Sequence, residues 1–156
     1  MRKTTQVALA LTVLAATIIL IGEIRSVDST GQLEVERVVD GDTLIGYYNG
    51  QKETVRLIGI DAPEIGECVS LNAAHMLAHI TIGRTLRGET ETKDRDRYGR
   101  LLLNLYTNGG RYINEMLVSK GAAMQMAVSP NTEHISRLYE AEKTADRLSL
   151  GLHREC

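Results

Sequence analysis

The sequence predicts a mainly β domain with attached helices, and three observations support this fold class. Segments between residues 32 and 107 alternate polar and apolar side chains in the two-residue period of β-strands. The pair Asn49–Gly50 is a strong signal for a hairpin between two of these strands. Segments with helical spacing lie between the third and fourth strands and again near the C-terminus.

The first three strands are expected to form a meander over residues 32–39, 43–48 and 51–60. In the first strand, Leu33 and Val35 alternate with acidic residues. A turn over residues 40–42 leads to the second strand, and Asn49–Gly50 leads to the third. Pro63 ends the third strand, because proline lacks the N–H that a strand ladder needs.

The remaining elements are a helix, two strands and two helices, at residues 70–82, 85–93, 100–107, 113–120 and 131–150. Gly83 and Gly121 close the first two helices. The charged loop 94–99 joins the last two strands. Five strands with three α-helices in this order are typical of an OB-fold barrel, which commonly binds oligonucleotides or oligosaccharides.

Composition indicates a folded domain without a generic affinity for nucleic acid. The chain has 156 residues, of which 43% are hydrophobic and 24% charged. It has no Trp or Phe and six Tyr, so we expect a core of Leu, Ile, Val, Ala and Met. Lys and Arg number 18 against 20 acidic residues. Any recognition of phosphate must therefore be local.

Residues 1–25 carry an export pattern. Arg2 and Lys3 precede an uncharged run over residues 4–22, which is just long enough to span a bilayer. We expect an exported, extracytoplasmic protein in which residues 1–25 are an uncleaved membrane anchor or a cleaved signal peptide. A buried core helix is the remaining alternative. Residues 26–31 form a polar linker and residues 32–156 the folded domain.

Cys68 and Cys156 are the two cysteines of the chain. An even count in an exported protein suggests a disulfide, which would tie the C-terminus to the loop after Glu64. Two unpaired thiols, or a bond to another chain, are the alternatives. The Cys/His spacing of a zinc site is absent from the sequence.

Two acidic turns are candidates for a metal site. Asp42 and Asp61 each lie at the end of a predicted strand, beside a Gly or Ala. Carboxylates at adjacent strand ends can converge on one ion, and the backbone carbonyl of Ala62 can add a third oxygen. Oxygen ligands without nearby His or Cys favour Ca²⁺ or Mg²⁺. The alternative is that both are turn-favouring aspartates without a metal.

Three further residues suit chemistry on a phosphodiester. Arg56 interrupts an otherwise apolar strand, so it is either buried with an anionic partner or exposed on an edge strand. Arg100 enters the last strand after a glycine, and its guanidinium can bind phosphate oxygens in a fork. Glu64 follows Pro63 and can serve as a general base for water, or be an ordinary exposed residue.

Together these residues resemble the staphylococcal-nuclease-like, or thermonuclease, family. The resemblance rests on three motifs, Val38–Thr43, Val55–Glu64 and Asp96–Arg100. Each motif alone is weak, but their order and spacing as a set are specific. The resemblance extends from about residue 33 to residue 152, which is nearly the whole predicted domain.

The resemblance implies a monomeric nuclease that uses one Ca²⁺ ion to hydrolyse DNA and RNA, leaving 3′-phosphate ends. Asp42, Asp61 and the Ala62 carbonyl would be the calcium ligands, with Asp40 supporting them without touching the ion. Glu64 would orient or deprotonate water. Arg56 and Arg100 would bind the phosphate. Tyr98 would form a hydrogen bond with a substrate phosphate.

The sequence departs from the family where bases bind. Met126 and Val128 correspond to two tyrosines that flank the substrate base in the best-known member, and base stacking contributes about 1–3 kcal/mol per base. Two alternatives to a nuclease remain: a non-catalytic OB module that binds nucleic acid or protein, and a structural domain stabilised by calcium. Retention of Arg56, Glu64 and Arg100 favours the nuclease.

Overall fold

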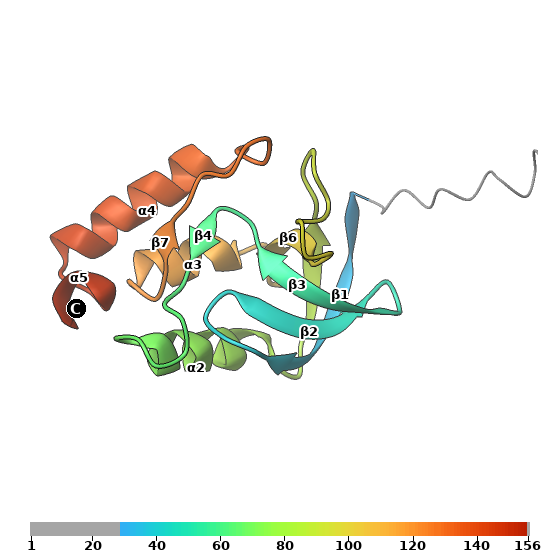
Figure 1. The fold of residues 1–156 in the computed structure, drawn as a ribbon, viewed down its shortest axis with the longest axis horizontal. Helices are drawn as coiled ribbons and strands as arrows, with labels where there is room; N and C mark the ends of the chain where they lie inside the picture. The colour runs from blue at the N-terminus through green and yellow to red at the C-terminus, as the bar shows by residue number, and fades with distance from the viewer. Residues whose placement is uncertain (1–28, 156) are drawn as a thin grey trace, which may run out of the picture.

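The computed structural model describes residues 29–155, and five strands in it close into a barrel. Around the barrel the order is β1 (Thr30–Val38), β2 (Thr43–Tyr48), β3 (Gln51–Leu57), β6 (Leu101–Tyr106) and β5 (Thr85–Glu89). Neighbouring strands are antiparallel except β3 and β6, which run parallel (Figure 1). The predicted five-stranded barrel is therefore confirmed.

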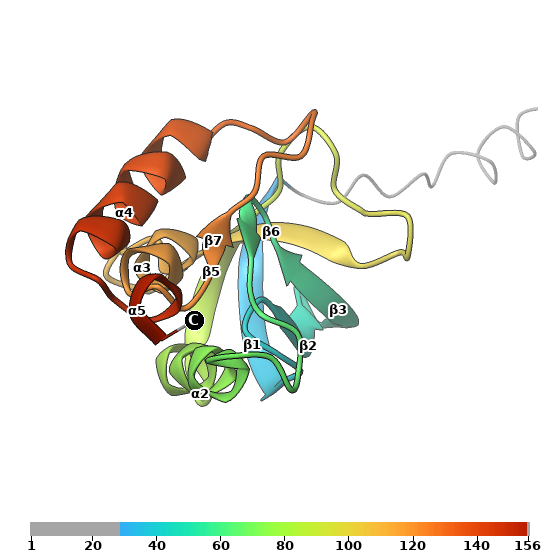
Figure 2. The same ribbon diagram turned by 60° about the vertical axis from the view of Figure 1, so that its left-hand side comes forward.

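Four helices accompany the barrel in the described residues: α2 (Ser70–Thr81), α3 (Ile113–Ser119), α4 (Ile135–Arg147) and α5 (Leu152–Glu155). In Figures 1 and 2, α3, α4 and α5 lie on one side of the barrel and α2 lies below it. The first three match the predicted helices, although α4 begins four residues after Asn131, because Asn131 forms a β-bridge to Val128 and a turn at Glu133 and His134 follows. The short α5 was not predicted.

The third predicted strand is broken, which corrects its expected span of residues 51–60. β3 ends at Leu57, and Gly59 adopts a left-handed conformation with φ 75°. A side chain at Gly59 would also meet Leu138 of α4, because a Cβ there would lie 2.5 Å from Leu138 Cδ1. The chain then forms β4 (Ile60–Asp61), which pairs with β7 (Met124–Gln125) outside the barrel. The break carries Asp61 out of the barrel wall.

The core is largely aliphatic, as predicted, but tyrosines take a larger part than expected. Leucines from β1, β2, β3, β5 and β6 fill the barrel, together with Leu77 from α2 and Ile113 and Leu117 from α3. Tyr112 is 1% exposed, and its hydroxyl donates to Asn104 Oδ1 at 2.6 Å. Burial raises the pKa of Tyr112 above its usual value. Methionine contributes less, since Met76 and Met116 are only partly buried.

Asn114 at the start of α3 links the helix to the barrel. Its buried Nδ2 donates to the carbonyl oxygens of Ile58 at 2.9 Å and Leu103 at 3.4 Å. Its Oδ1 accepts from the backbone N–H of Leu105 at 3.1 Å. One amide thus satisfies backbone groups of β6 and of the turn after β3. Because that turn leads directly to Asp61, Asn114 helps to fix the position of the acidic residues.

Two sequence predictions concern residues outside the described range. The signal peptide or anchor over residues 1–25 lies there, and so does Cys156, so the disulfide to Cys68 stays a prediction. Cys68 itself lies in the loop between β4 and α2. Within residues 29–155, no helix has both the length and the apolar character needed to cross a membrane.

Replacing Asn114 with alanine is expected to lower the free energy of unfolding by about 2–3 kcal/mol, because buried backbone groups lose their partners. Urea unfolding followed by circular dichroism measures this loss. Asn108→Ala is the control, since Asn108 is exposed in the loop after β6 and its removal should change stability little. Equal stability of the two variants would contradict the role assigned to Asn114.

Candidate active site

Arg56 is the central residue of the predicted site, and it is largely buried. It lies near the end of β3, opposite Thr43 of β2 and Leu102 of β6. Its Nη1 lies 2.9 Å from Asp42 Oδ2, and its Nη2 lies 2.8 Å from Asp61 Oδ1. Its side chain is 11% exposed, which rules out the alternative of an exposed arginine on an edge strand. The guanidinium therefore brings two predicted metal ligands together.

Arg56 also closes the turn that follows β3. Nη1 donates to the carbonyl oxygens of Ile60 at 2.8 Å and Leu57 at 3.3 Å. Those two residues bracket the left-handed Gly59, so the arginine holds both ends of the break in the strand. The same side chain that pairs with Asp61 thus also fixes the backbone that presents Asp61.

Asp42 is placed by the acidic turn between β1 and β2. Asp40 Oδ1 accepts the backbone N–H groups of Asp42 at 3.0 Å and Thr43 at 2.7 Å. This arrangement is an Asx turn, in which a side chain replaces a backbone acceptor. Gly41 permits close packing, because a Cβ there would lie 2.5 Å from the Cβ of Ala62. Asp40 therefore supports Asp42, in agreement with its predicted role.

Burial makes the Asp42 carboxylate costly to ionise. The residue is 5% exposed, and burial raises the pKa of Asp42 to about 6, against the opposing effects of Arg56 and of the Ala62 N–H. That N–H donates to Asp42 Oδ2 at 2.7 Å, and the Thr43 hydroxyl donates to Oδ1 at 2.9 Å. A carboxylate buried in this way gains strongly from a nearby cation.

The donor set fits a hard divalent cation such as Ca²⁺. Asp42 and Asp61 converge on one positively charged group, so both carboxylates already face a position where positive charge is favourable. Asp61 remains accessible, with 57% of its side chain exposed. Ala62 lies next to both and would supply a backbone carbonyl. All of these donors are oxygens, the ligands that Ca²⁺ prefers.

A second group of potential metal ligands does not coincide with this site. Among residues 29–155, ligand atoms of Glu91, Glu133 and His134 lie within 4.8 Å of one another. Glu91 already accepts hydrogen bonds from Asn104 Nδ2 at 2.9 Å and from the Glu133 N–H at 3.1 Å. The His134 ring is hydrogen-bonded to the Tyr106 hydroxyl at 3.1 Å. These contacts account for the grouping without an ion.

Arg100 is held by an aspartate that the sequence reasoning did not single out. Asp96 Oδ2 accepts from Arg100 Nε at 2.6 Å, while Oδ1 accepts the backbone N–H groups of Tyr98 at 2.9 Å and Arg100 at 3.0 Å. Burial raises the pKa of Asp96, but these hydrogen bonds outweigh it and the pKa is lowered overall. Since Asp96 uses Nε, the two amino groups of the Arg100 guanidinium stay available for phosphate oxygens.

Tyr98 is exposed between two arginines. It is 69% exposed, and its hydroxyl accepts a hydrogen bond from Arg97 Nη2 at 2.6 Å. The guanidinium carbons of Arg97 and Arg100 lie 4.8 Å and 5.5 Å from the centre of its ring. Such cation–π contacts gather positive charge beside the ring. This hydrogen bond does not use the Tyr98 hydroxyl proton, and the contact with a substrate phosphate stays a prediction.

A cleft of about 390 Å³ joins the two predicted phosphate-binding arginines. Arg56, Tyr98 and Arg100 line one part of it, and Met126 and Val128 line another. Two residues of the cleft lining, Asn131 and Lys93, are hydrogen-bonded to each other. Asn131 Oδ1 accepts the Lys93 N–H at 2.8 Å, and Asn131 Nδ2 donates to the Lys93 carbonyl at 2.6 Å. The residues that replace base-flanking tyrosines therefore lie in the same cleft as the arginines.

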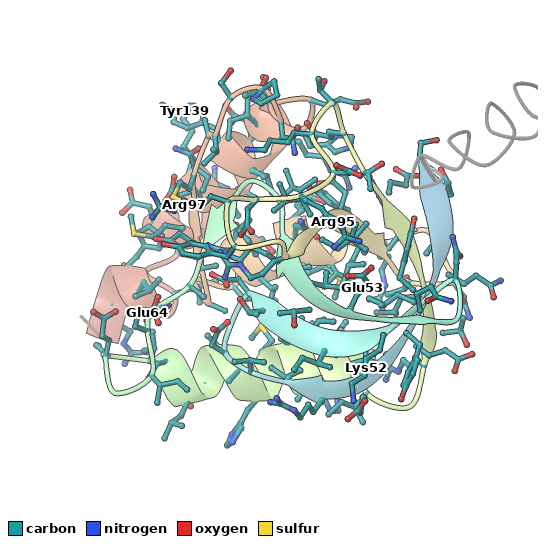
Figure 3. All side chains as sticks on the ribbon, turned by 45° about the vertical axis from the view of Figure 1, so that its right-hand side comes forward. Lys52, Glu53, Glu64, Arg95, Arg97 and Tyr139 are labelled. Atoms are coloured by element: carbon teal, nitrogen blue, oxygen red, sulfur yellow. The ribbon has the colours of Figure 1, made fainter. Side chains whose placement is uncertain are left out.

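Glu64 is not hydrogen-bonded or ion-paired to Arg56 or Arg100 in the described residues. It is exposed in the loop between β4 and α2, and Figure 3 labels its side chain on that loop. Its backbone N–H donates to Glu67 Oε2 at 2.9 Å, and its carbonyl accepts the Glu67 N–H at 2.9 Å. The contacts that join Asp42, Asp61 and Arg56 therefore do not include Glu64.

Comparison with known proteins places this site in a family. A family model described as "Staphylococcal nuclease homologue" matches residues 54–155. The micrococcal nuclease of Shigella flexneri is 36% identical over 152 residues, covering 92% of this chain and 84% of that protein. The thermonuclease of Staphylococcus hyicus is 30% identical over 125 residues, covering 76% and 73%.

A longer relative shows the same level of similarity. Endonuclease YncB of Bacillus subtilis (strain 168) is 36% identical over 126 residues, which cover 74% of this chain and 59% of that protein. The residues matched by the family model include Arg56, Asp61, Glu64 and Arg100, while Asp42 precedes them. With this match and the barrel described above, the chain belongs to the staphylococcal nuclease family.

Proposed function

We propose that this protein is a calcium-dependent nuclease that hydrolyses phosphodiester bonds of DNA and RNA and leaves 3′-phosphate ends. The observation that carries the proposal is the convergence of Asp42 and Asp61 on Arg56, which itself lines a cleft together with Arg100. The similar proteins bear the names micrococcal nuclease, thermonuclease and endonuclease, which supports a hydrolase acting on nucleic acid.

The acidic side chains would hold the ion, and the arginines would hold the substrate. Asp42, Asp61 and the Ala62 carbonyl supply oxygen ligands, and Asp40 keeps Asp42 in place. Bound Ca²⁺ would supply positive charge to a phosphate oxygen and to the attacking water. Arg100 presents its free amino groups to the phosphate, where they stabilise the charge that develops as the bond to phosphorus forms.

Glu64 would act on water from the open side of the cleft. Its loop position leaves the carboxylate exposed, so it can approach a water molecule once substrate occupies the cleft. A carboxylate within hydrogen-bonding distance of water can accept its proton as the water attacks phosphorus. The P–O5′ bond would then break, so that the phosphate stays on the 3′ side and the departing 5′ oxygen takes a proton from solvent. The proton of Tyr98 is suited to a non-bridging phosphate oxygen, which helps to orient the scissile bond.

We further propose that the protein is exported and acts as a monomer. The basic start and uncharged run over residues 1–25 support export, through a cleaved signal or an anchor over residues 4–22. Nucleic acid is the proposed partner, and recognition relies on the cleft because the chain as a whole is acidic, with a formal net charge of −2.

Glu64→Gln is expected to slow cleavage by about 10²- to 10⁴-fold, because glutamine cannot accept the proton of water. The assay incubates the full-length chain, purified in mild detergent, with plasmid and single-stranded DNA, with Ca²⁺ or with a chelator. Glu140→Gln on the exposed face of α4 is the matched control and should retain full activity. Absence of calcium-dependent cleavage, or an unchanged rate in Glu64→Gln, would refute the proposal.

Asp42→Asn is expected to abolish the rise in unfolding temperature that Ca²⁺ causes, because a ligand that binds only the folded state stabilises it. With chelator, the stability of the natural chain should fall as pH rises from about 4 through about 6, and this fall should be absent from the variant. The sign follows from the raised pKa of Asp42: the folded state favours the protonated form, so stability falls as pH rises through about 6.

Differential scanning calorimetry with Ca²⁺ and with chelator measures both effects. Asp146→Asn is the control, because Asp146 lies on α4 and 76% of its side chain is exposed. That variant should keep the calcium-induced shift. An equal shift in Asp42→Asn would show that Asp42 is not a ligand.

A further inference from the structure

Residues 94–100 form a loop between β5 and β6 that supplies much of the positive charge in the cleft. We call it the arginine loop, since Arg97 and Arg100 line the cleft and Arg95 lies between Asp94 and Asp96. Loops exposed to solvent lose conformational entropy when they are fixed, so a loop that presents a guanidinium accurately needs anchoring contacts. The contacts of Arg95 provide such an anchor.

Arg95 makes a two-pronged ion pair with Glu53 of β3. Its Nη2 donates to Glu53 Oε1 at 2.6 Å, and its Nη1 donates to Oε2 at 2.9 Å. Figure 3 labels both side chains, one from the strand and one from the loop. Parallel hydrogen bonds between a guanidinium and a carboxylate restrict orientation as well as distance. Glu53 is the less exposed partner, with 19% of its side chain exposed against 38% for Arg95.

The same guanidinium also holds the other end of the loop. Arg95 Nη1 donates to the carbonyl oxygen of Gly99 at 2.9 Å, and Gly99 directly precedes Arg100. Gly99 is in the left-handed region with φ 80°, where the chain turns toward β6. Arg95 therefore connects three points: the start of the loop, the turn before Arg100, and strand β3.

Strand β3 thereby sets the position of both phosphate-binding arginines. It carries Arg56 directly, and three residues earlier it carries Glu53. The loop is attached to the same region of the sheet, because Arg95 forms a β-bridge to Leu101, which is paired with Val55 of β3. Asp96 follows Arg95 in the loop, and it restrains Arg100 by accepting a hydrogen bond from the Arg100 Nε.

We propose that Glu53 and Arg95 are positioning residues that fix Arg100 relative to Arg56 for the phosphodiester. The inference rests on the proposed nuclease function, and it adds two residues outside the roles derived above. Neither residue needs to touch substrate. Their contribution is to keep the Arg100 guanidinium where charge develops in the transition state, since a displacement of about 1 Å can cost up to a hundredfold in rate.

The kinetic test compares Glu53→Gln with Lys52→Ala in the full-length chain, using single-stranded DNA and Ca²⁺. Lys52 is the neighbouring residue of β3 and forms an ion pair with Glu36 that does not involve the loop. Glu53→Gln is expected to lower kcat by about tenfold with little change in KM, because transition-state contacts are lost. Lys52→Ala should match the natural chain. An unchanged kcat in Glu53→Gln would overturn the proposal.

A double-mutant cycle separates positioning from a general loss of stability. In an Arg100→Ala background, Glu53→Gln should cause no further loss of kcat, because the residue that it positions is absent. Exchanging the charges in Glu53→Arg/Arg95→Glu should restore part of the activity. An equal loss in both backgrounds would show that Glu53 does not act through Arg100.

Hydrogen exchange tests the anchoring contact without relying on catalysis. Amides of residues 94–100 should exchange about tenfold faster in Glu53→Gln than in Lys52→Ala, because the loop opens more often. Unchanged exchange would overturn the proposal even in an active enzyme. If the natural chain cleaves no nucleic acid, the proposed function fails on that result alone, while the exchange rates still decide whether Glu53 holds the loop.

Discussion

Arg56 supplies the positive charge that holds two acidic residues and a backbone turn in place at the end of β3. Its guanidinium pairs with Asp42 and Asp61 and holds the carbonyl oxygens of Leu57 and Ile60. Without it, two carboxylates would face each other at the end of β3, one of them buried. One guanidinium therefore both neutralises the two carboxylates and fixes the backbone turn. Asp42 and Asp61 keep their arrangement because Arg56 lies between them.

Much of the fold was predictable because it follows from local chemistry. Asn49–Gly50 predicted the hairpin, and Tyr48 and Gln51 do pair across it. The break after Leu57 was not predicted, because Gly59 lies within an apolar run that has the pattern of a continuous strand. Two of the contacts that fix this turn come from distant parts of the sequence: Leu138 packs against Gly59, and Asn114 Nδ2 donates to the Ile58 carbonyl.

The site was predicted residue by residue through its motifs, whereas its supporting contacts were not. Asp96 lies within a predicted motif but reads as one member of a charged loop. Glu53 and Arg95 have no motif at all, and their pairing depends on the parallel alignment of β3 with β6. Partner choice among many exposed charges is set by tertiary structure, so spacing in the sequence carries little information about it.

The internal pairing of the arginines has a consequence for turnover. Arg56 already has carboxylate partners, Arg100 has Asp96, and Arg97 rests against Tyr98. A phosphate that approaches Arg56 would compete with its two carboxylates, whereas the amino groups of Arg100 can bind phosphate without displacing Asp96. If the protein cleaves phosphodiesters as proposed, a product phosphate would meet the same competition at Arg56, because Asp42 and Asp61 can pair with its guanidinium again. In the proposed nuclease, carboxylates paired with Arg56 would therefore favour release of product over tight retention of nucleic acid.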